Sequence, residues 1–251
     1  MAQINLRSVS VEFPIYNLSG RSFKKAVLHR TTGGTISRDA QEKVIIKALN
    51  DISIDFHHGE RIGLIGHNGS GKSTLLRLLA KIYEPNTGQL HIEGQISPLL
   101  DISLGVEAEL TGYENIYSRG ILLGLSRKQI KNQMHEIAEL TCLGDYLSMP
   151  VRTYSAGMKI RLAFAVSTSI KPDILLIDEV FGAGDADFME KAKNRMVSLL
   201  DQSSIVIMAT HSDDLITEFC TKALIMDAGR IKYFGSTEEA LSIYHGKTLS
   251  T

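Results

Sequence analysis

The sequence predicts an α/β fold with an inserted, mostly helical part, and three observations lead to that prediction. Short apolar runs at 61–65, 174–177 and 205–209 are typical of strands, and helical patterns lie between them. A glycine-rich turn joins the first of these strands directly to a helix. From about residue 97 to residue 169 the pattern is mostly helical.

The first strands of the chain are predicted from alternation. Apolar and polar residues alternate from 8 to 13 and again from 51 to 56, which indicates two strands that each bury one face. The polar stretch between them, residues 17–43, is expected to be an insertion or a long loop. Basic residues in this stretch include Arg21, Lys24, Lys25 and Arg30. This stretch is either a solvated hairpin or a basic surface for lipid head groups or a partner.

The remaining helices and strands are predicted from the helical pattern of apolar residues and from short apolar runs. The predicted helices cover 75–82, 188–200 and 237–244, and the predicted strands cover 90–92, 224–226 and 231–234. The tetrapeptide Asp227-Ala228-Gly229-Arg230 separates the last two strands and predicts a hairpin turn.

Composition excludes several classes of protein. Hydrophobic residues make up 43% of the 251 residues, which suits a globular protein whose core needs neither disulfides nor metals. The net charge of −1 does not argue for nucleic acid as a partner or for wholesale binding to an anionic membrane. Cys142 and Cys220 lie far apart, so we expect both to be reduced. No signal peptide or membrane-spanning stretch is visible, so we expect any work at a membrane to need a partner.

The turn before the first predicted helix carries the strongest chemical signal. Residues 66–73, Gly-His-Asn-Gly-Ser-Gly-Lys-Ser, fit the pattern G-x-x-x-x-G-K-[ST] between a strand and a helix. Glycines let backbone N–H groups curl around phosphate oxygens, Lys72 reaches the β- and γ-phosphates, and Ser73 ligates Mg²⁺. The predicted nucleotide-binding residues are Gly66, His67, Asn68, Gly69, Ser70, Gly71, Lys72, Ser73 and Thr74.

An acidic pair follows the apolar strand at 174–177. Asp178 suits Mg²⁺, directly or through water, and Glu179 is then positioned to polarise the attacking water as general base. An apolar run followed by two acids is by itself often a strand end that meets solvent. Together with the phosphate loop, which is the name used below for the glycine-rich turn at residues 66–73, the acidic pair predicts nucleotide hydrolysis.

A second candidate phosphate site lies at a predicted helix start, Tyr154 to Arg161. Ser155 is a good N-cap, and the glycine at 157 leaves room for an anion. The alternative is an ordinary capped helix. One chain has no need for two γ-phosphate sites on one nucleotide, whereas two chains facing head to tail would use both.

These motifs together resemble the ABC ATPase family over almost the whole chain. Residues 154–158 are similar to its LSGGQ signature, with Ala156 and Met158 as departures. Asp185, in Ala-Gly-Asp, resembles the D-loop aspartate, and His211 resembles the switch histidine that contacts the γ-phosphate.

Two positions of the family pattern are less clear in this sequence. Phe13 stands where the family places an aromatic residue on adenine, although Tyr16 is a second candidate and Phe13 could equally be strand core. The family's Q-loop glutamine is absent from its expected place, and Asp101 stands near that place instead. Asp101 is therefore a candidate for contact with Mg²⁺ or a water.

The resemblance implies a single ABC ATPase domain over residues 1–251, with a RecA-like α/β core, an antiparallel β subdomain and an inserted α-helical subdomain. The expected parts are an antiparallel β and phosphate-loop part (1–96, with the insertion at 17–43), a helical subdomain with the signature (97–169), the rest of the core (170–235) and a C-terminal helix and tail (236–251).

A narrower resemblance comes from the runs 109–117, 154–159 and 178–188 and from the early insertion, which are similar to ATPases of bacterial polysaccharide exporters. Such exporters move O-antigen, capsule or teichoic-acid chains. Some O-antigen members carry a C-terminal carbohydrate-binding domain, which we do not expect here because the sequence ends after one short helix.

This resemblance implies an ATP hydrolase that uses Mg²⁺ and forms an ATP-dependent homodimer. It implies a separate transmembrane permease in a two-plus-two complex, a lipid-linked polysaccharide as cargo, and a peripheral position on the cytoplasmic face of the bacterial inner membrane. The alternatives are another exporter cargo, a soluble ABC protein of repair or translation, an ATP-dependent binding switch, and a small-molecule kinase.

Overall fold

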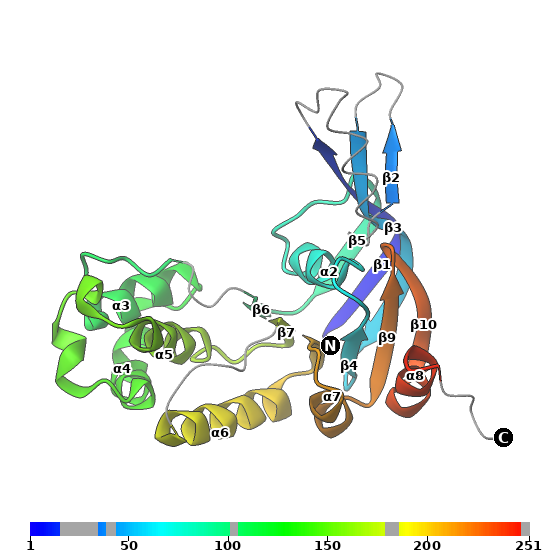
Figure 1. The fold of residues 1–251 in the computed structure, drawn as a ribbon. Helices are drawn as coiled ribbons and strands as arrows, with labels where there is room; N and C mark the ends of the chain where they lie inside the picture. Colours follow the sequence, from blue (N-terminus) through cyan, green and yellow to red (C-terminus); the bar gives the residue numbers. More distant parts are fainter. Residues whose placement is uncertain (16–34, 39–43, 101–104, 179–185, 247–251) are drawn as a thin grey trace.

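The computed structural model describes residues 1–15, 35–38, 44–100, 105–178 and 186–246, which form two sheets and a group of helices (Figure 1). An antiparallel sheet has the order β2-β3-β1-β5, and a six-stranded sheet has the order β10-β9-β4-β8-β7-β6. The strands are β1 (Gln3–Ile15), β2 (Thr35–Arg38), β3 (Val44–His57), β4 (Arg61–Ile65), β5 (Thr87–Glu93), β6 (Ile96–Leu99), β7 (Ile174–Asp178), β8 (Ile205–Ala209), β9 (Lys222–Asp227) and β10 (Arg230–Ser236).

Most of the helices lie beside or below the six-stranded sheet in Figure 1. The α-helices are α2 (Lys72–Leu79), α3 (Gly112–Leu122), α4 (Arg127–Thr141), α5 (Ala156–Ser167), α6 (Ala186–Gln202), α7 (Asp213–Phe219) and α8 (Thr237–Tyr244), and the 3₁₀ helices are η1 (Gly144–Ser148) and η2 (Val151–Thr153). The predicted α/β fold is confirmed.

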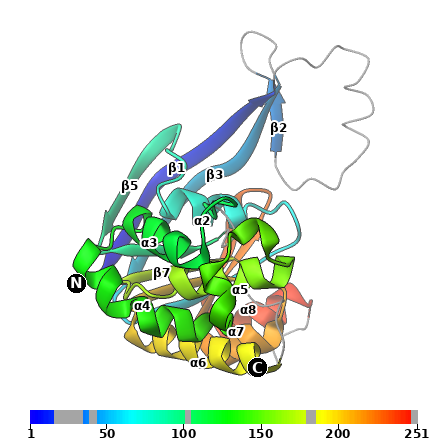
Figure 2. The same cartoon turned by 90° about the vertical axis from the view of Figure 1, so that its left-hand side faces the viewer.

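The long strands β1 and β3 extend together towards β2 (Figures 1 and 2). Each contains an irregularity that shifts the alternation by one residue, because Ser8 and Asp51 have left-handed φ values of 49° and 58°. As a result Leu6 is buried before the first shift and Val9 after it. The predicted one-sided strands are therefore present, and they are longer than the alternation alone indicated.

The helix after the glycine-rich turn, α2, packs against strands of both sheets. Leu75, Leu76, Leu78 and Leu79 are all fully buried in a core that includes residues of β1, β3, β4, β7 and β8. The helix ends at Leu79, three residues before its predicted end, near Lys81 with its left-handed φ of 59°. The start of α2 is thus held rigidly at one edge of the parallel strands.

The central strands β4, β7 and β8 of the six-stranded sheet are buried on both faces. In β7, Ile174 and Leu176 face the core that contains α2, whereas Leu175 and Ile177 face a second core with α6. This arrangement explains why the sequence of these strands is uniformly apolar and does not alternate.

The helices α3, α4 and α5 form a group of their own, apart from the antiparallel sheet (Figures 1 and 2). Capping boxes begin α3 at Thr111 with Glu114 and α4 at Ser126 with Gln129. The expectation of helical structure from about residue 97 is wrong at its start, because Ile96–Leu99 pairs with β7 as strand β6. The strand was missed because four residues that include a proline carry little periodicity.

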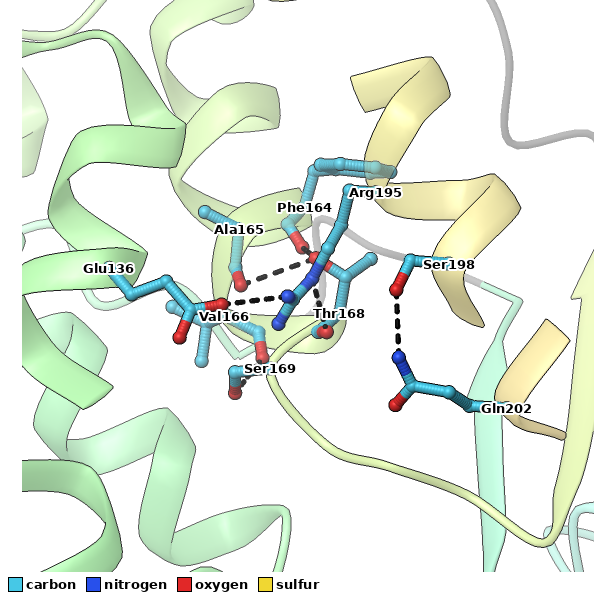
Figure 3. A network of polar contacts seen from close by, with 9 residues as sticks. All are labelled: Glu136, Phe164, Ala165, Val166, Thr168, Ser169, Arg195, Ser198 and Gln202. Carbon is cyan, nitrogen blue, oxygen red and sulfur yellow. Dashed lines mark hydrogen bonds and ion pairs between the residues drawn. The ribbon is translucent and has the colours of Figure 1, made fainter. Parts of the chain in front are cut away.

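One arginine joins this helical group to the core (Figure 3). Arg195 of α6 donates from Nε to the Thr168 carbonyl at the end of α5, at 2.9 Å, and from Nη1 to the Glu136 carboxylate of α4, at 2.7 Å. The planar guanidinium suits such a double contact, and a lysine could not reproduce it.

Of the basic insertion, residues 17–43, the structure describes only β2. This strand pairs with β3 in antiparallel register, Thr35 opposite Lys47 and Arg38 opposite Val44. Arg21, Lys24, Lys25 and Arg30 lie outside the described residues.

Candidate nucleotide-binding site

The glycine-rich turn between β4 and α2 is shaped by the chain around it. A side chain at Gly66, where φ is 152°, would collide with the Met226 carbonyl and lie 2.6 Å from Ser70 Oγ. A side chain at Gly71, where φ is 110°, would lie 2.8 Å from the Ala48 carbonyl oxygen. Only glycine fits these two positions without displacing backbone from other strands.

The lysine that follows the turn points back into it. Lys72 is only 9% exposed, and its Nζ donates to the carbonyl of Gly66 at 2.5 Å and to that of His67 at 3.1 Å. Its ammonium group therefore lies inside the curve of the turn, next to the N-terminus of α2, and both features attract phosphate. Ser73 and Thr74 follow in the first turn of that helix.

Three parallel strands end together beside this turn. Leu64 of β4 is opposite Ala209 of β8, and Ala209 is in turn opposite Asp178 of β7. The phosphate loop, His211 and Asp178 therefore leave the same edge of one sheet, although they lie far apart in the sequence. This edge is where open α/β sheets bind ligands.

Three predicted site residues lie outside the described residues: Glu179, the predicted base, Asp185, the predicted D-loop residue, and Asp101. Asp178 is half-buried at the end of β7, and His211 is exposed just before α7.

The second candidate phosphate site begins α5. Ser155 is its N-cap, with Oγ accepting a hydrogen bond from the Met158 N–H at 3.2 Å. Tyr154 anchors this start from behind: it is 5% exposed, and its hydroxyl donates to the Tyr146 carbonyl at 2.5 Å. Burial raises the pKa of the Tyr154 hydroxyl, so it stays a neutral donor.

The two candidate phosphate sites of one chain do not meet. The start of α5 lies in the helical group, well apart from α2 (Figure 1). Ser155 is exposed, and among the described residues a methyl group at Gly157 would have no neighbour closer than Ser155 Oγ at 4.0 Å. This surface is open to a ligand or to another chain.

Phe13 lies in β1 opposite Ile46 of β3 and is half-buried. Its ring meets the Tyr83 ring edge-on, with 5.2 Å between centroids, and it packs against the core around α2. The aromatic alternative, Tyr16, lies outside the described residues.

Sequence reasoning missed a partner of the phosphate loop. His67 Nε2 lies 3.0 Å from Asp227 Oδ1, in the turn between β9 and β10. The two residues are 160 positions apart, and Asp227 stood out in the sequence only as part of a hairpin turn. No sequence signal could have paired them, because the contact depends on β9 lying next to β4 in the sheet.

The oxygen donors at the edge of the sheet suit a hard cation. Ser73 offers a hydroxyl and Asp178 a carboxylate, and Mg²⁺ binds such donors together with phosphate oxygens and water. Within the described residues, no three His, Cys, Asp or Glu side chains gather in a way that could hold a metal alone. The hydroxyl and the carboxylate together suit a cation that a bound nucleotide also contacts.

None of the described helices has the length and apolar character needed to cross a membrane.

The fold is shared with solved ATP-binding cassettes. A structure described as the ATP-binding subunit of an ABC transporter matches with a TM-score of 0.71 at 20% identity, covering 99% of this chain and 95% of that one. A dimeric cassette in a post-hydrolysis state, bound to ADP and phosphate, matches with a TM-score of 0.67 at 19% identity, covering 93% and 98%.

Sequence comparison identifies relatives along nearly the full chain. The O-antigen export system ATP-binding protein RfbE of Yersinia enterocolitica is 43% identical over 92% of this chain and 97% of its own length. RfbB of Myxococcus xanthus, also named for O-antigen export, is 39% identical over 97% of this chain, which spans 56% of that protein. The teichoic acids export ATP-binding protein TagH of Staphylococcus haemolyticus is 34% identical over 96% of this chain and 87% of its own.

The sequence model of the ABC transporter family matches residues 49–182, which run from β3 through the phosphate loop and the signature to the acidic pair. With this match, with relatives of up to 43% identity, and with the phosphate loop and Asp178 at one sheet edge, the chain belongs to the ABC transporter family as an ATP-hydrolysing, ATP-binding subunit.

Proposed function

We propose that this chain is the ATPase subunit of an exporter that moves lipid-linked polysaccharide, O-antigen in particular, across the cytoplasmic membrane. The observation that carries the ATPase site is the common edge at which β4, β8 and β7 end. The cargo is proposed from the relatives, since the protein of 43% identity and nearly equal length is named for O-antigen export.

In this proposal, the residues at this edge of the sheet have different roles in hydrolysis. Residues 66–74 wrap the phosphates, and the Lys72 ammonium neutralises charge on the β- and γ-phosphates. Ser73 and Asp178 would hold Mg²⁺, which would supply positive charge against the phosphate oxygens. Glu179 orients the attacking water, and His211 contacts the γ-phosphate. Because the transition state spreads charge over the phosphoryl oxygens, positioning and electrostatics supply most of the catalysis.

Three further residues are candidates, either because they lie outside the described residues or because they have two interpretations. Asp185 is proposed to meet the facing chain as the D-loop aspartate, and Asp101 to take the Q-loop position. Phe13 is proposed to stack on adenine, although its contact with Tyr83 also fits a packing role. Replacing Phe13 by leucine would distinguish the two, because packing tolerates leucine whereas adenine stacking does not.

The second chain completes the site in this proposal. Ser155 and Gly157 would contact the γ-phosphate bound to the facing copy, so that two chains enclose two ATP molecules. The open surface at Gly157 supports this arrangement, because no described residue of its own chain requires a glycine there.

The transmembrane partner is proposed to dock on the helical group. Tyr113, Tyr117 and Ile121 of α3 are spaced four residues apart and are each about 40% exposed, at 41%, 39% and 43%. Apolar side chains at this spacing form a stripe on one face of a helix, which suits a partner's helix. The complex would hold two such chains and two permease subunits at the cytoplasmic face of the inner membrane.

The first experiment measures ATP hydrolysis and molecular size for the purified native protein and for Glu179→Gln, with Mg²⁺-ATP. We expect the native protein to hydrolyse ATP, and the variant to be inactive and trapped as an ATP-dependent dimer. Glu190→Gln, an exposed residue of α6, is the matched control and should behave as the native protein does. A Glu179→Gln variant that hydrolyses ATP normally and stays monomeric would contradict the proposal.

A second experiment tests the cargo in cells that depend on this chain. Removing it should leave lipid-linked glycan inside and none at the surface, and the native gene, but not Lys72→Ala, should restore export. Normal surface glycan in its absence would refute the export role. Recovery of the protein away from membranes with the permease present would favour a soluble ABC protein of repair or translation.

A further inference from the structure

His67, the second residue of the phosphate loop, lies between two hydrogen-bond acceptors. Its Nδ1 lies 2.8 Å from the Asn68 carbonyl oxygen, and its Nε2 lies 3.0 Å from Asp227 Oδ1. A neutral imidazole has one N–H donor and one bare nitrogen, so it can satisfy only one of these contacts. Both contacts are satisfied together only when the ring carries two protons and a positive charge.

The charges around the ring favour that state. The pKa of His67 is raised, first by the Asn68 carbonyl and then by Asp227, while burial and the nearby Lys72 act in the opposite direction. The pKa of the Asp227 carboxyl is lowered, chiefly by His67, and Lys232 of β10 contacts its other oxygen at 3.4 Å. Arg230, on the same turn, faces Asn50 instead.

The turn that carries Asp227 also supports the phosphate loop through its backbone. The Gly229 N–H donates to the Ser70 carbonyl at 3.0 Å, and the Met226 carbonyl lies against Gly66. Ala228 and Gly229 have φ values of 47° and 75°, as a tight hairpin turn of type I′ requires. The β9–β10 turn therefore contacts the loop near its beginning and near its end.

We propose that Asp227 is a positioning residue for ATP: it keeps His67 doubly protonated, so that the phosphate loop presents a second positive charge beside Lys72, and this charge is lost as the pH rises. The inference rests on the proposed function of residues 66–74 as the phosphate site. The inference implies that ATP binding depends on pH through Asp227, a residue outside the phosphate loop.

The direction of the pH effect follows from the raised pKa. Below the ordinary histidine pKa of about 6.5 the ring is charged with or without a partner, so its favourable contact with Asp227 and its attraction for phosphate are both fully present. As the pH rises through the raised pKa the ring loses its charge, and both contributions disappear. ATP itself also titrates near neutral pH, so variants are to be compared with the native protein at each pH.

The test measures the KM for ATP and kcat from pH 5.5 to pH 9 for native protein, His67→Gln, Asp227→Asn and Asp227→Glu. The side chains of His67 and Asp227 are 52% and 45% exposed, so we expect a modest effect, an increase in KM of about two- to fivefold, with kcat little changed. For His67→Gln the increase should be present at low pH and should vanish at high pH. For Asp227→Asn the increase in KM should be largest between the pH at which His67 titrates in the variant and the pH at which it titrates in native protein. Asp227→Glu should behave as native protein does.

The matched control is His245→Gln. His245 Nε2 lies 2.7 Å from Asp213 Oδ2, with 43% and 48% of the side chains exposed, so the pair resembles that of His67 but belongs to α7 and the end of α8. This variant should follow the native protein at every pH. Proton NMR of the histidine ring gives an independent readout, in which Asp227→Asn should lower the pH at which His67 titrates.

The outcomes separate this inference from the proposed function. Native protein that neither binds nor hydrolyses ATP would overturn the assignment of the phosphate loop itself. Native protein that hydrolyses ATP, with Asp227→Asn and His245→Gln equal across the pH range, would overturn the role of Asp227 alone. A His67 ring that titrates at the same pH with and without Asp227 would do so as well, even if the variant lost stability.

Discussion

The phosphate loop and the start of α5 are both helix starts that contain glycine, but their glycines are required for different reasons. At Gly66 and Gly71 the space for a side chain is filled by backbone atoms of Met226 and Ala48, which belong to other strands. At Gly157 that space is open, with only Ser155 Oγ at 4.0 Å among the described residues. The first site is shaped from inside the chain, whereas the second leaves room for something outside it.

This difference indicates which part of the site a single chain can build. The phosphate loop is held by the β9–β10 turn, by α2 and by its own lysine, so it has its shape before any partner arrives. The start of α5 is anchored from behind by Tyr154. Variants that add one methyl group to each site test whether their glycines are required for different reasons.

The largest effect is expected for Gly66→Ala. Its φ of 152° is unfavourable for alanine, and the new methyl group would collide with the Met226 carbonyl. We expect a loss of about 3 kcal/mol in the free energy of unfolding, measured with urea, together with the loss of ATP binding. Native stability in this variant would mean that the loop is not held by the strands around it.

Gly157→Ala is expected to separate folding from activity. The methyl group meets no described residue, and alanine favours a helix over glycine by about 0.5–1 kcal/mol, so stability should be kept or slightly raised. If a second chain packs here, ATP hydrolysis should fall by about tenfold, which corresponds to about 1.4 kcal/mol.

Gly112→Ala is the control for this prediction. There the methyl group would lie 2.6 Å from the Tyr154 hydroxyl and 2.7 Å from Leu147 Cδ2, so stability should fall. Full ATPase activity in Gly157→Ala would show that the start of α5 is an ordinary capped helix.

An effect of similar size is expected at the bridge between the helical group and the core. Arg195→Ala removes the contacts to Thr168 and Glu136, and its side chain is only 24% exposed. We expect a loss of about 1.5 kcal/mol in the free energy of unfolding, against less than about 1 kcal/mol for Glu136→Ala, whose carboxylate is mostly solvated. Equal losses would mean that the ion pair, and not the contact with the α5 end, carries the bridge.

The smallest effect is expected in the turn that supports the phosphate loop. Ala228 has a left-handed φ of 47°, which glycine adopts without strain. Ala228→Gly should therefore raise the thermal midpoint slightly, because the free energy of unfolding should increase by about 0.5–1 kcal/mol. The KM for ATP should not change. A fall in the midpoint would show that the flexibility gained by the unfolded chain outweighs the strain that is relieved.

Much of this protein was determined by the sequence itself. The phosphate loop, the acidic pair and the capped start of α5 are local patterns, because each depends on residues that are neighbours in the chain. The uniformly apolar strands also marked the sheet, since burial on both faces leaves no room for polar residues. Short strand β6 was missed because its pairing with β7 supplies what four residues cannot specify alone.

Tertiary structure decided which of these local patterns meet. The order of strands β9, β4, β8 and β7 brings Asp227, the phosphate loop, His211 and Asp178 to one edge, and nothing local to any of them specifies that order. The same order pairs His67 with a carboxylate, which helps to raise the pKa of the ring. Sequence patterns could therefore predict the residues of the phosphate site, but only packing between distant strands could place the Asp227 carboxylate beside His67, because that contact acts through space and not along the chain.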